Sequence, residues 1–108
     1  MNAIILKISK RANEELGYPD PVDVITNFIK EGYTGLYKMA PEGLDIEWVG
    51  IQYKGKIVAK GRYLGVITEG KKKRIVCTST SCHDQKVEKE KGSNPIRYCD
   101  YQEGVFIL

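Results

Sequence analysis

Basic side chains are concentrated in one short part of the sequence. Residues 54–74 carry eight basic side chains and one acidic one, a net charge of +7, although the whole chain has a net charge of only +3. A positive stretch of this density attracts polyanions and favours contacts with phosphates. The basic residues that we predict to bind nucleic acid are Lys56, Lys60, Arg62, Lys71, Lys72, Lys73 and Arg74. The alternative is a solvated lysine-rich face, which is common on proteins that bind nothing acidic.

Aromatic residues are interleaved with these cations and precede them. A base that has left its stack needs a π surface to replace the lost stacking, and cations outside such a pocket would hold the phosphates. The residues predicted to form this base pocket are Tyr37, Trp48, Tyr53 and Tyr63. The alternative is that Trp48 and Tyr63 are core residues whose polar atoms find local partners.

Three cysteines and the single histidine have the composition of a three-cysteine, one-histidine zinc site: Cys77, Cys82, His83 and Cys99. The spacing argues against zinc, because Cys82 and His83 are adjacent and no C-x-x-C motif is present. We therefore expect buried or incidental thiols and no metal. The odd number of cysteines also disfavours a disulfide framework and favours a reducing, cytoplasmic setting.

No residue is predicted to be catalytic. Cys82 beside His83 lacks an orienting partner for nucleophilic chemistry. Asp45 and Glu47 would lie roughly 7 Å apart on one face of a strand, a separation that acid-base catalysis can use, but an exposed strand face explains them more simply. The sequence has no phosphate-binding glycine loop and no serine, histidine and aspartate order. It therefore favours a binding protein over an enzyme, and predicts no cofactor.

The elements that must position these residues begin with a strand and a helix. Residues 2–8 form a continuous apolar run of strand length, typical of a strand buried on both sides. Residues 9–16 favour a short helical turn. A longer helix is predicted from Asp20, a favourable N-cap, through the apolar spacing of Val22, Ile25, Phe28 and Ile29 to a stop at Gly32.

The rest of the chain is predicted to be mainly strands. We expect strands over residues 33–40, 44–53, 56–68 and 74–78, and a buried final strand over residues 105–108. Gly50 lies at a change of alternation phase, which indicates a bulge or bend, and Lys54-Gly55 is typical of a two-residue hairpin turn. Residues 79–94 have no clear period, so we expect a loop or a short helix there.

Length and hydropathy bound the architecture. The 108 residues are enough for one domain with a real core, and no apolar run approaches the roughly 18 residues of a membrane span, so we expect no membrane partner. Nothing in the sequence is typical of a signal peptide. The predicted fold is α+β: a single domain over residues 1–108, with one or two N-terminal helices and a small curved or barrel-like, mostly antiparallel sheet.

Three segments carry a resemblance to a known superfamily. These are Gly35-Leu36-Tyr37-Lys38-Met39, Trp48-Val49-Gly50-Ile51 and the run Gly55 to Ile67. In their order the chain resembles the PUA-like superfamily, with its EVE, ASCH and YTH branches, over roughly residues 1–70. The resemblance implies binding of RNA or DNA, often through one modified or flipped base in an aromatic pocket. The glycine-lysine signature near the start of ASCH domains is absent, which disfavours an ASCH-type hydrolase.

Three classes of function follow. The first is a nucleic-acid binding module that recognises a modified or flipped base, with RNA and DNA both open. The second is a small protein-binding inhibitor or adaptor, of the kind that mobile elements or host defence use, which predicts an exposed apolar patch or a dimer face. The third is a small nucleotide-directed hydrolase, which predicts a polar cavity with a perturbed carboxylate, lysine or cysteine. The oligomeric state is open.

Overall fold

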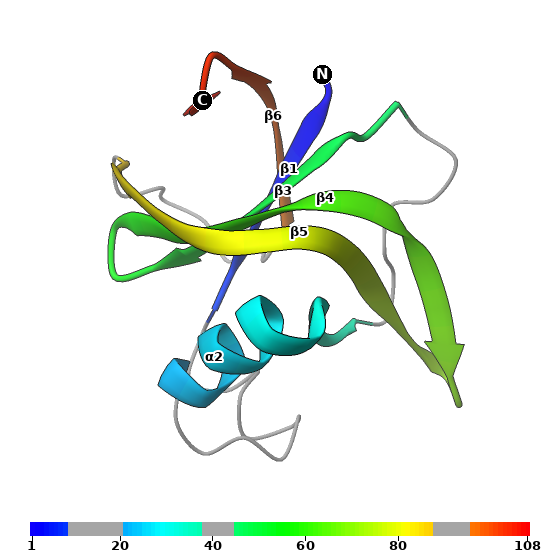
Figure 1. Ribbon diagram of the computed structural model, residues 1–108. Helices are drawn as coiled ribbons and strands as arrows, with labels where there is room; N and C mark the ends of the chain where they lie inside the picture. Colours follow the sequence, from blue (N-terminus) through cyan, green and yellow to red (C-terminus); the bar gives the residue numbers. More distant parts are fainter. Residues whose placement is uncertain (9–20, 38–44, 88–95) are drawn as a thin grey trace.

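Seven strands form one curved sheet, and a helix packs against one of its faces (Figure 1). The structure is a computed structural model that describes residues 1–8, 21–37, 45–87 and 96–108. The sheet order is β2-β5-β4-β3-β1-β6-β7. The strands are β1 (Ala3–Lys7), β2 (Tyr33–Tyr37), β3 (Trp48–Tyr53), β4 (Lys56–Glu69), β5 (Lys72–Lys86), β6 (Ile96–Gln102) and β7 (Val105–Ile107). An α+β fold is confirmed, with an open sheet in place of a closed barrel.

The first strand lies inside the sheet and is buried on both sides, as its sequence predicts. β1 pairs in parallel with β3 and antiparallel with β6. Ile4 and Leu6 belong to one core cluster, while Ala3 and Ile5 belong to another on the opposite face. The parallel pair makes the sheet mixed, although its other strand pairs are antiparallel.

Helix α2 (Pro21–Glu31) covers one face, which we call the helix face. Phe28 is fully buried there among residues of β1, β3, β4 and β5. The helix ends where predicted, because Gly32 has a positive φ of 77° and its N–H donates to the carbonyl oxygen of Phe28 at 2.9 Å. Asp20 and the turn expected over residues 9–16 lie outside the described residues. In the described part of the chain, no helix has the length and apolar character needed to cross a membrane.

The opposite face, which we call the aromatic face, has its own core. Its buried residues are Ala3, Ile5, Ile57, Cys99 and Phe106. Gly50 explains how Phe106 of β7 can lie against β3: a Cβ at this position would be 2.9 Å from Cζ of Phe106. The sequence predicts a bulge at Gly50, whereas the register shift lies between Ile51 and Gln52. The glycine is needed here for close packing.

The long hairpins are extended further than predicted. Lys54 and Gly55 have φ values of 49° and 76°, which confirms the two-residue turn between β3 and β4. The loop or helix expected over residues 79–94 is wrong for residues 79–86, which continue β5 and pair with β4. Register shifts along this pair interrupt the alternation of polar and apolar residues, which hides the strand in the sequence. Residues 88–95 lie outside the described residues.

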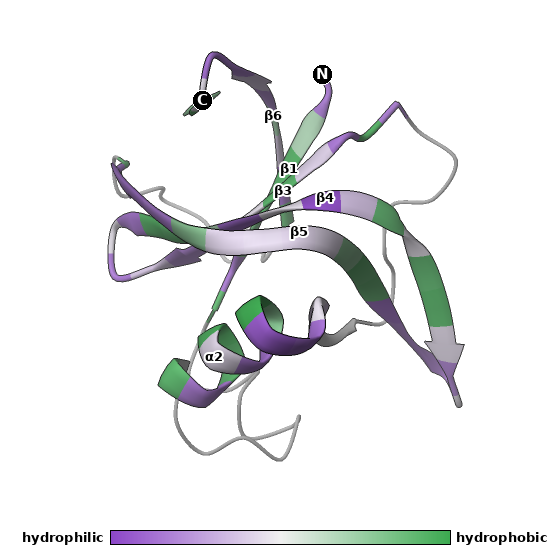
Figure 2. Ribbon diagram, in the orientation of Figure 1, coloured by the Kyte–Doolittle hydropathy of each residue, from purple (hydrophilic) through white to green (hydrophobic). Residues whose placement is uncertain are grey.

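Two other strands differ from their predictions, one in where it begins and one in how far it is buried. β3 begins at Trp48, so exposed Asp45 and Glu47 precede it and are not on a strand. In β7 only Phe106 is buried, because Val105 and Ile107 lie on an outer strand of the sheet and point to solvent. Figure 2 shows a further apolar stretch on the distal half of β4, where Leu64 and Ile67 are exposed, next to a hydrophilic hairpin end.

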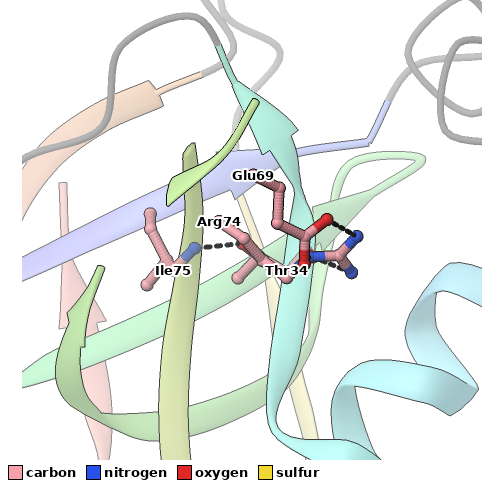
Figure 3. A network of polar contacts seen from close by, with 4 residues as sticks. All are labelled: Thr34, Glu69, Arg74 and Ile75. Carbon is pink, nitrogen blue, oxygen red and sulfur yellow. Dashed lines mark hydrogen bonds and ion pairs between the residues drawn. The ribbon is translucent and has the colours of Figure 1, made fainter. Parts of the chain in front are cut away.

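The other outer strand, β2, is held by a side chain. Its register with β5 shifts between Tyr33 and Leu36. Within this irregularity the buried hydroxyl of Thr34 accepts a hydrogen bond from the backbone N–H of Ile75 at 2.9 Å (Figure 3). The Thr34 carbonyl oxygen accepts from the guanidinium of Arg74 at 3.2 Å.

Candidate nucleic-acid interface

Trp48 is surrounded by one aromatic ring and two cations on the aromatic face. Its ring centroid is 4.4 Å from that of Tyr101, with 30° between the ring planes. The Arg62 guanidinium lies over the indole at 5.2 Å, and Lys60 Nζ lies at 5.9 Å. Lys60 also donates a hydrogen bond to the Tyr101 hydroxyl at 3.0 Å. We call these four residues the cation-aromatic cluster.

The sheet register brings the cluster together from three strands. Trp48 of β3 pairs directly with Arg62 of β4, and directly paired residues point to the same face. On the other side of β3, β1 lies between β3 and β6. Tyr101 of β6 reaches Trp48 across the start of β1. Asn2 fixes the Tyr101 backbone there by donating to its carbonyl oxygen at 3.1 Å and accepting from its N–H at 2.7 Å.

The aromatic contacts continue beyond the cluster. The ring of Tyr101 meets that of Phe106 at 4.8 Å, and Phe106 meets the His83 ring edge-on at 5.5 Å. A connected row of rings therefore runs from Trp48 through Tyr101 and Phe106 to His83. Because Phe106 is buried and the other three are only half-buried, the row joins the core to the surface.

The two cations of the cluster keep their charge available to an anion. Each cation-π contact contributes about 0.5–1 kcal/mol at exposed sites and holds the side chain over the ring without neutralising it. Across the described ranges, the ion pairs recorded involve other groups, and none joins a carboxylate to Lys60 or Arg62. The cluster thus presents two ordered positive charges beside an indole.

The structure separates the other predicted cations from this cluster. Lys56 lies at the β3–β4 turn, with its Nζ 3.7 Å from Asp84. The segment Lys71 to Arg74 lies around the β4–β5 turn. At the usual rise per residue, the part of β4 between Arg62 and Glu69, where this turn begins, is roughly 23 Å long. The Arg74 Nε lies 3.3 Å from Oε1 of Glu69 in an ion pair, and Nη2 of Arg74 donates a hydrogen bond to Oε2 of the same carboxylate at 3.3 Å (Figure 3). Arg74 is therefore engaged with the edge of the sheet.

The four predicted pocket aromatics do not converge. Tyr63 packs against the helix-face core, whereas Trp48 packs against the aromatic-face core. Tyr53 lies at the end of β3, beside Lys54 at 5.2 Å. The side chain of Tyr37 lies outside the described part of the chain. Of the four predicted aromatic residues, only Trp48 therefore belongs to the candidate site.

The rings of Trp48 and Tyr101 also leave no slot between them. A base inserted between two rings would need a centroid separation of roughly 7 Å, twice the rise of about 3.4 Å between stacked bases. The observed separation is 4.4 Å. A ligand would therefore meet the outer side of the cluster.

Tyr101 is the residue that the sequence reasoning missed. The signal was present, because Cys99 and Tyr101 alternate with the more polar Asp100 and Gln102 in β6. This alternation predicts a strand with one covered face, but not that the strand would lie next to β1.

The cysteines and the histidine do not gather into a metal site. Cys77 lies in the helix-face core and Cys99 in the aromatic-face core, while Cys82 is exposed and His83 contacts Phe106. Among the residues that the structure describes, no three His, Cys, Asp or Glu side chains are arranged to hold a metal ion. Burial raises the pKa of Cys77 to about 12 and, mainly through burial as well, that of Cys99 to about 11. Both are therefore poor nucleophiles near neutral pH.

Two surface hollows are lined by residues outside the cluster, although one of them includes Phe106, which contacts Tyr101. One, of about 440 Å³, is lined by Met1, Asp45, Ile46 and Tyr98. The other, of about 360 Å³, is lined by Gln85, Lys86, Val87, Arg97, Phe106 and Leu108.

Comparison of the chain with protein families, with curated proteins and with solved structures gives no match.

Proposed function

We propose that this protein binds single-stranded nucleic acid on its aromatic face, through the cation-aromatic cluster. The observation that carries the proposal is the placement of Lys60 and Arg62 over the Trp48 ring, without carboxylate partners among the described residues. Cations beside aromatic side chains are the combination that binds single strands, since the cations hold the backbone and π surfaces stack with bases.

A single strand fits this surface better than a duplex. The bases of a duplex are stacked on one another, so their faces cannot reach an aromatic cluster on a sheet. An unpaired base can lie against the outer side of the cluster, where the Arg62 guanidinium lies over the Trp48 ring. A more specific form of this proposal is that the cluster recognises one modified or flipped base of the strand, as in the PUA-like superfamily.

The test uses the only tryptophan of the chain as the reporter. Titration with oligo(dT) and oligo(U) of about 12 nucleotides should quench Trp48 fluorescence, and a duplex of equal length should bind more weakly. The variant Lys60→Glu with Arg62→Glu should lose affinity on the order of 100-fold or more, because two attractive contacts become repulsive. For the milder variant Lys60→Gln with Arg62→Gln, the slope of log K against log salt should fall by about 1.4, the contribution of two phosphate contacts in a single strand.

A matched control changes the same charge elsewhere. Lys30 is exposed on α2, away from the aromatic face, and Lys54 lies at the β3–β4 turn. The variant Lys30→Glu with Lys54→Glu should bind within a few-fold of the wild-type protein at the same salt concentration. Equal losses in the two double variants would mean that net charge alone drives binding, and no loss at Lys60 and Arg62 would reject the proposed surface.

A further variant tests the basic hairpin end separately. Lys71 is exposed in the turn between β4 and β5, far along β4 from Trp48. Lys71→Glu should weaken binding of a long oligonucleotide more than that of a short one, if the strand runs along β4. An equal effect on both lengths would place the hairpin end outside the path of the strand.

A further inference from the structure

Beside the cation-aromatic cluster, β5 presents two hydroxyl groups to the same face. Arg62 pairs directly with Thr78, and Lys60 pairs directly with Ser81. Directly paired residues in an antiparallel sheet point to the same side. Thr78 and Ser81 are both exposed, so their side chains lie on the surface beside the two residues that carry the cations.

A bulge in β5 makes this arrangement possible. Between these two pairs β4 advances by two residues and β5 by three, which leaves one extra residue on β5. Ser79 has a φ of 51° in this stretch, and Thr80 is turned to the helix face, where its hydroxyl donates to the Ile29 carbonyl oxygen at 2.6 Å. Without the extra residue, Thr78 and Ser81 would fall on opposite faces, because their spacing is odd.

We propose that Thr78 and Ser81 complete, with Lys60 and Arg62, a subsite for one backbone phosphate of a single-stranded nucleic acid. This inference rests on the proposed function and adds the place of one phosphate and the side on which its base lies. Hydroxyl and guanidinium groups are common partners of phosphate oxygens, and here two hydroxyls adjoin two cations that no carboxylate neutralises in the described ranges.

The positions of these groups also predict how the ligand lies across the sheet. The groups follow one another from hydroxyls on β5, through cations on β4 and Trp48 on β3, to Tyr101 on β6. This row crosses four strand intervals, roughly 19 Å at the usual spacing. A phosphate over β4 and β5 therefore directs the attached base toward Trp48, so that the nucleotide lies across the strands.

The experiment compares hydroxyl removal with charge removal. In titrations with fluorescein-labelled oligo(dT) of about 12 nucleotides, Thr78→Ala with Ser81→Ala should lose about tenfold or more in affinity, the effect of removing two hydrogen bonds from hydroxyls to phosphate oxygens. The salt slope should stay at the wild-type value, because no charge is removed. Thr78→Ser with wild-type Ser81 should retain affinity, and Thr26→Ala, on the exposed side of α2, is the matched control.

The outcomes separate this inference from the proposed function. An affinity of the hydroxyl-free variant within about twofold of the wild type, with binding still lost in Lys60→Glu with Arg62→Glu, would overturn the phosphate subsite and leave the proposed function intact. If the wild-type protein binds none of the oligonucleotides, the proposed function itself fails. Binding of free AMP as tightly as oligo(dT) would assign the subsite to a mononucleotide and reject the backbone phosphate.

Discussion

The amide side chain of Gln85 hydrogen-bonds both backbone polar groups of Phe106. Its Nε2 donates to the Phe106 carbonyl oxygen at 2.7 Å, and its Oε1 accepts from the Phe106 N–H at 2.9 Å. Gln85 thereby acts on β7 as a neighbouring strand would, and it links β5 to the other end of the open sheet. The same Oε1 is 3.0 Å from Nε2 of His83, which must therefore donate the proton in that contact.

Loss of this link should destabilise the aromatic face. Gln85→Ala removes the partner of both Phe106 groups and should lower the free energy of unfolding by about 1–2 kcal/mol. Urea denaturation measures the loss, and amide hydrogen exchange should become faster at Phe106. Gln102→Ala, at an exposed position of β6, is the control. Unchanged exchange at Phe106 in Gln85→Ala would contradict the role of this amide.

Gly50 should tolerate no side chain while Phe106 is present. In Gly50→Ala the new Cβ would lie 2.9 Å from Phe106 Cζ and 3.2 Å from Ile57 Cγ2, so the variant should be destabilised by about 1–3 kcal/mol. Adding Phe106→Leu should recover part of the loss in the double variant, because the blocking ring atoms are gone. Strictly additive losses in thermal or urea unfolding would show that the two residues do not compete for space.

Thr34 should be needed for its hydroxyl oxygen. Thr34→Val keeps the shape of the side chain but leaves the Ile75 N–H without its partner, at a cost of about 1–3 kcal/mol in unfolding free energy. Thr34→Ser keeps the acceptor and should cost less. If valine is tolerated as well as serine in chemical denaturation, the hydroxyl has no stabilising role at this edge.

The buried thiols predict a loss of stability in alkali. Because burial raises the pKa of Cys77 to about 12 and of Cys99 to about 11, both stay neutral in the folded protein after the unfolded chain has ionised at about 9. Ionisation of these thiols should therefore have little effect on stability below pH 9. Above it, stability should fall by up to about 1.4 kcal/mol per pH unit for each thiol, until the folded pKa is reached. The difference between wild-type protein and Cys99→Ala should shrink across this window, and a constant difference would contradict the assignment.

Much of the fold could be predicted from local patterns. The apolar run of β1, the N-terminal helix with its stop at Gly32, and the Lys54-Gly55 turn all depend on neighbouring residues, and all three are present. The C-terminal half of β5 could not be predicted in this way. Its bulges change which residues share a face, so the periodicity that identifies a strand is lost.

The candidate site was predictable only in part, for a related reason. Arg62, Lys60 and Trp48 were proposed from charge and aromatic character, and the β3–β4 hairpin brings them together over a short stretch of chain. Tyr101 joins them through the pairing of β6 with β1, which is set by packing between distant segments. The predicted base pocket also grouped Tyr63 with Trp48, but the two side chains lie on opposite faces of the sheet. Aromatic character alone carries no information on which face of a sheet a residue occupies.

The position of β1 has a consequence for how the protein reaches its native state. Its two neighbours, β3 and β6, lie about midway and near the end of the chain, with Ile4 opposite both Val49 and Tyr98. Closing such long loops costs entropy before any contact repays it, and folding rates fall as contacts become less local. Refolding should therefore be slow for a chain of this size. During synthesis one edge of the apolar first strand stays unpaired until β6 has been made, so this strand is open to wrong pairing for longer than the strands of the β3–β4 hairpin.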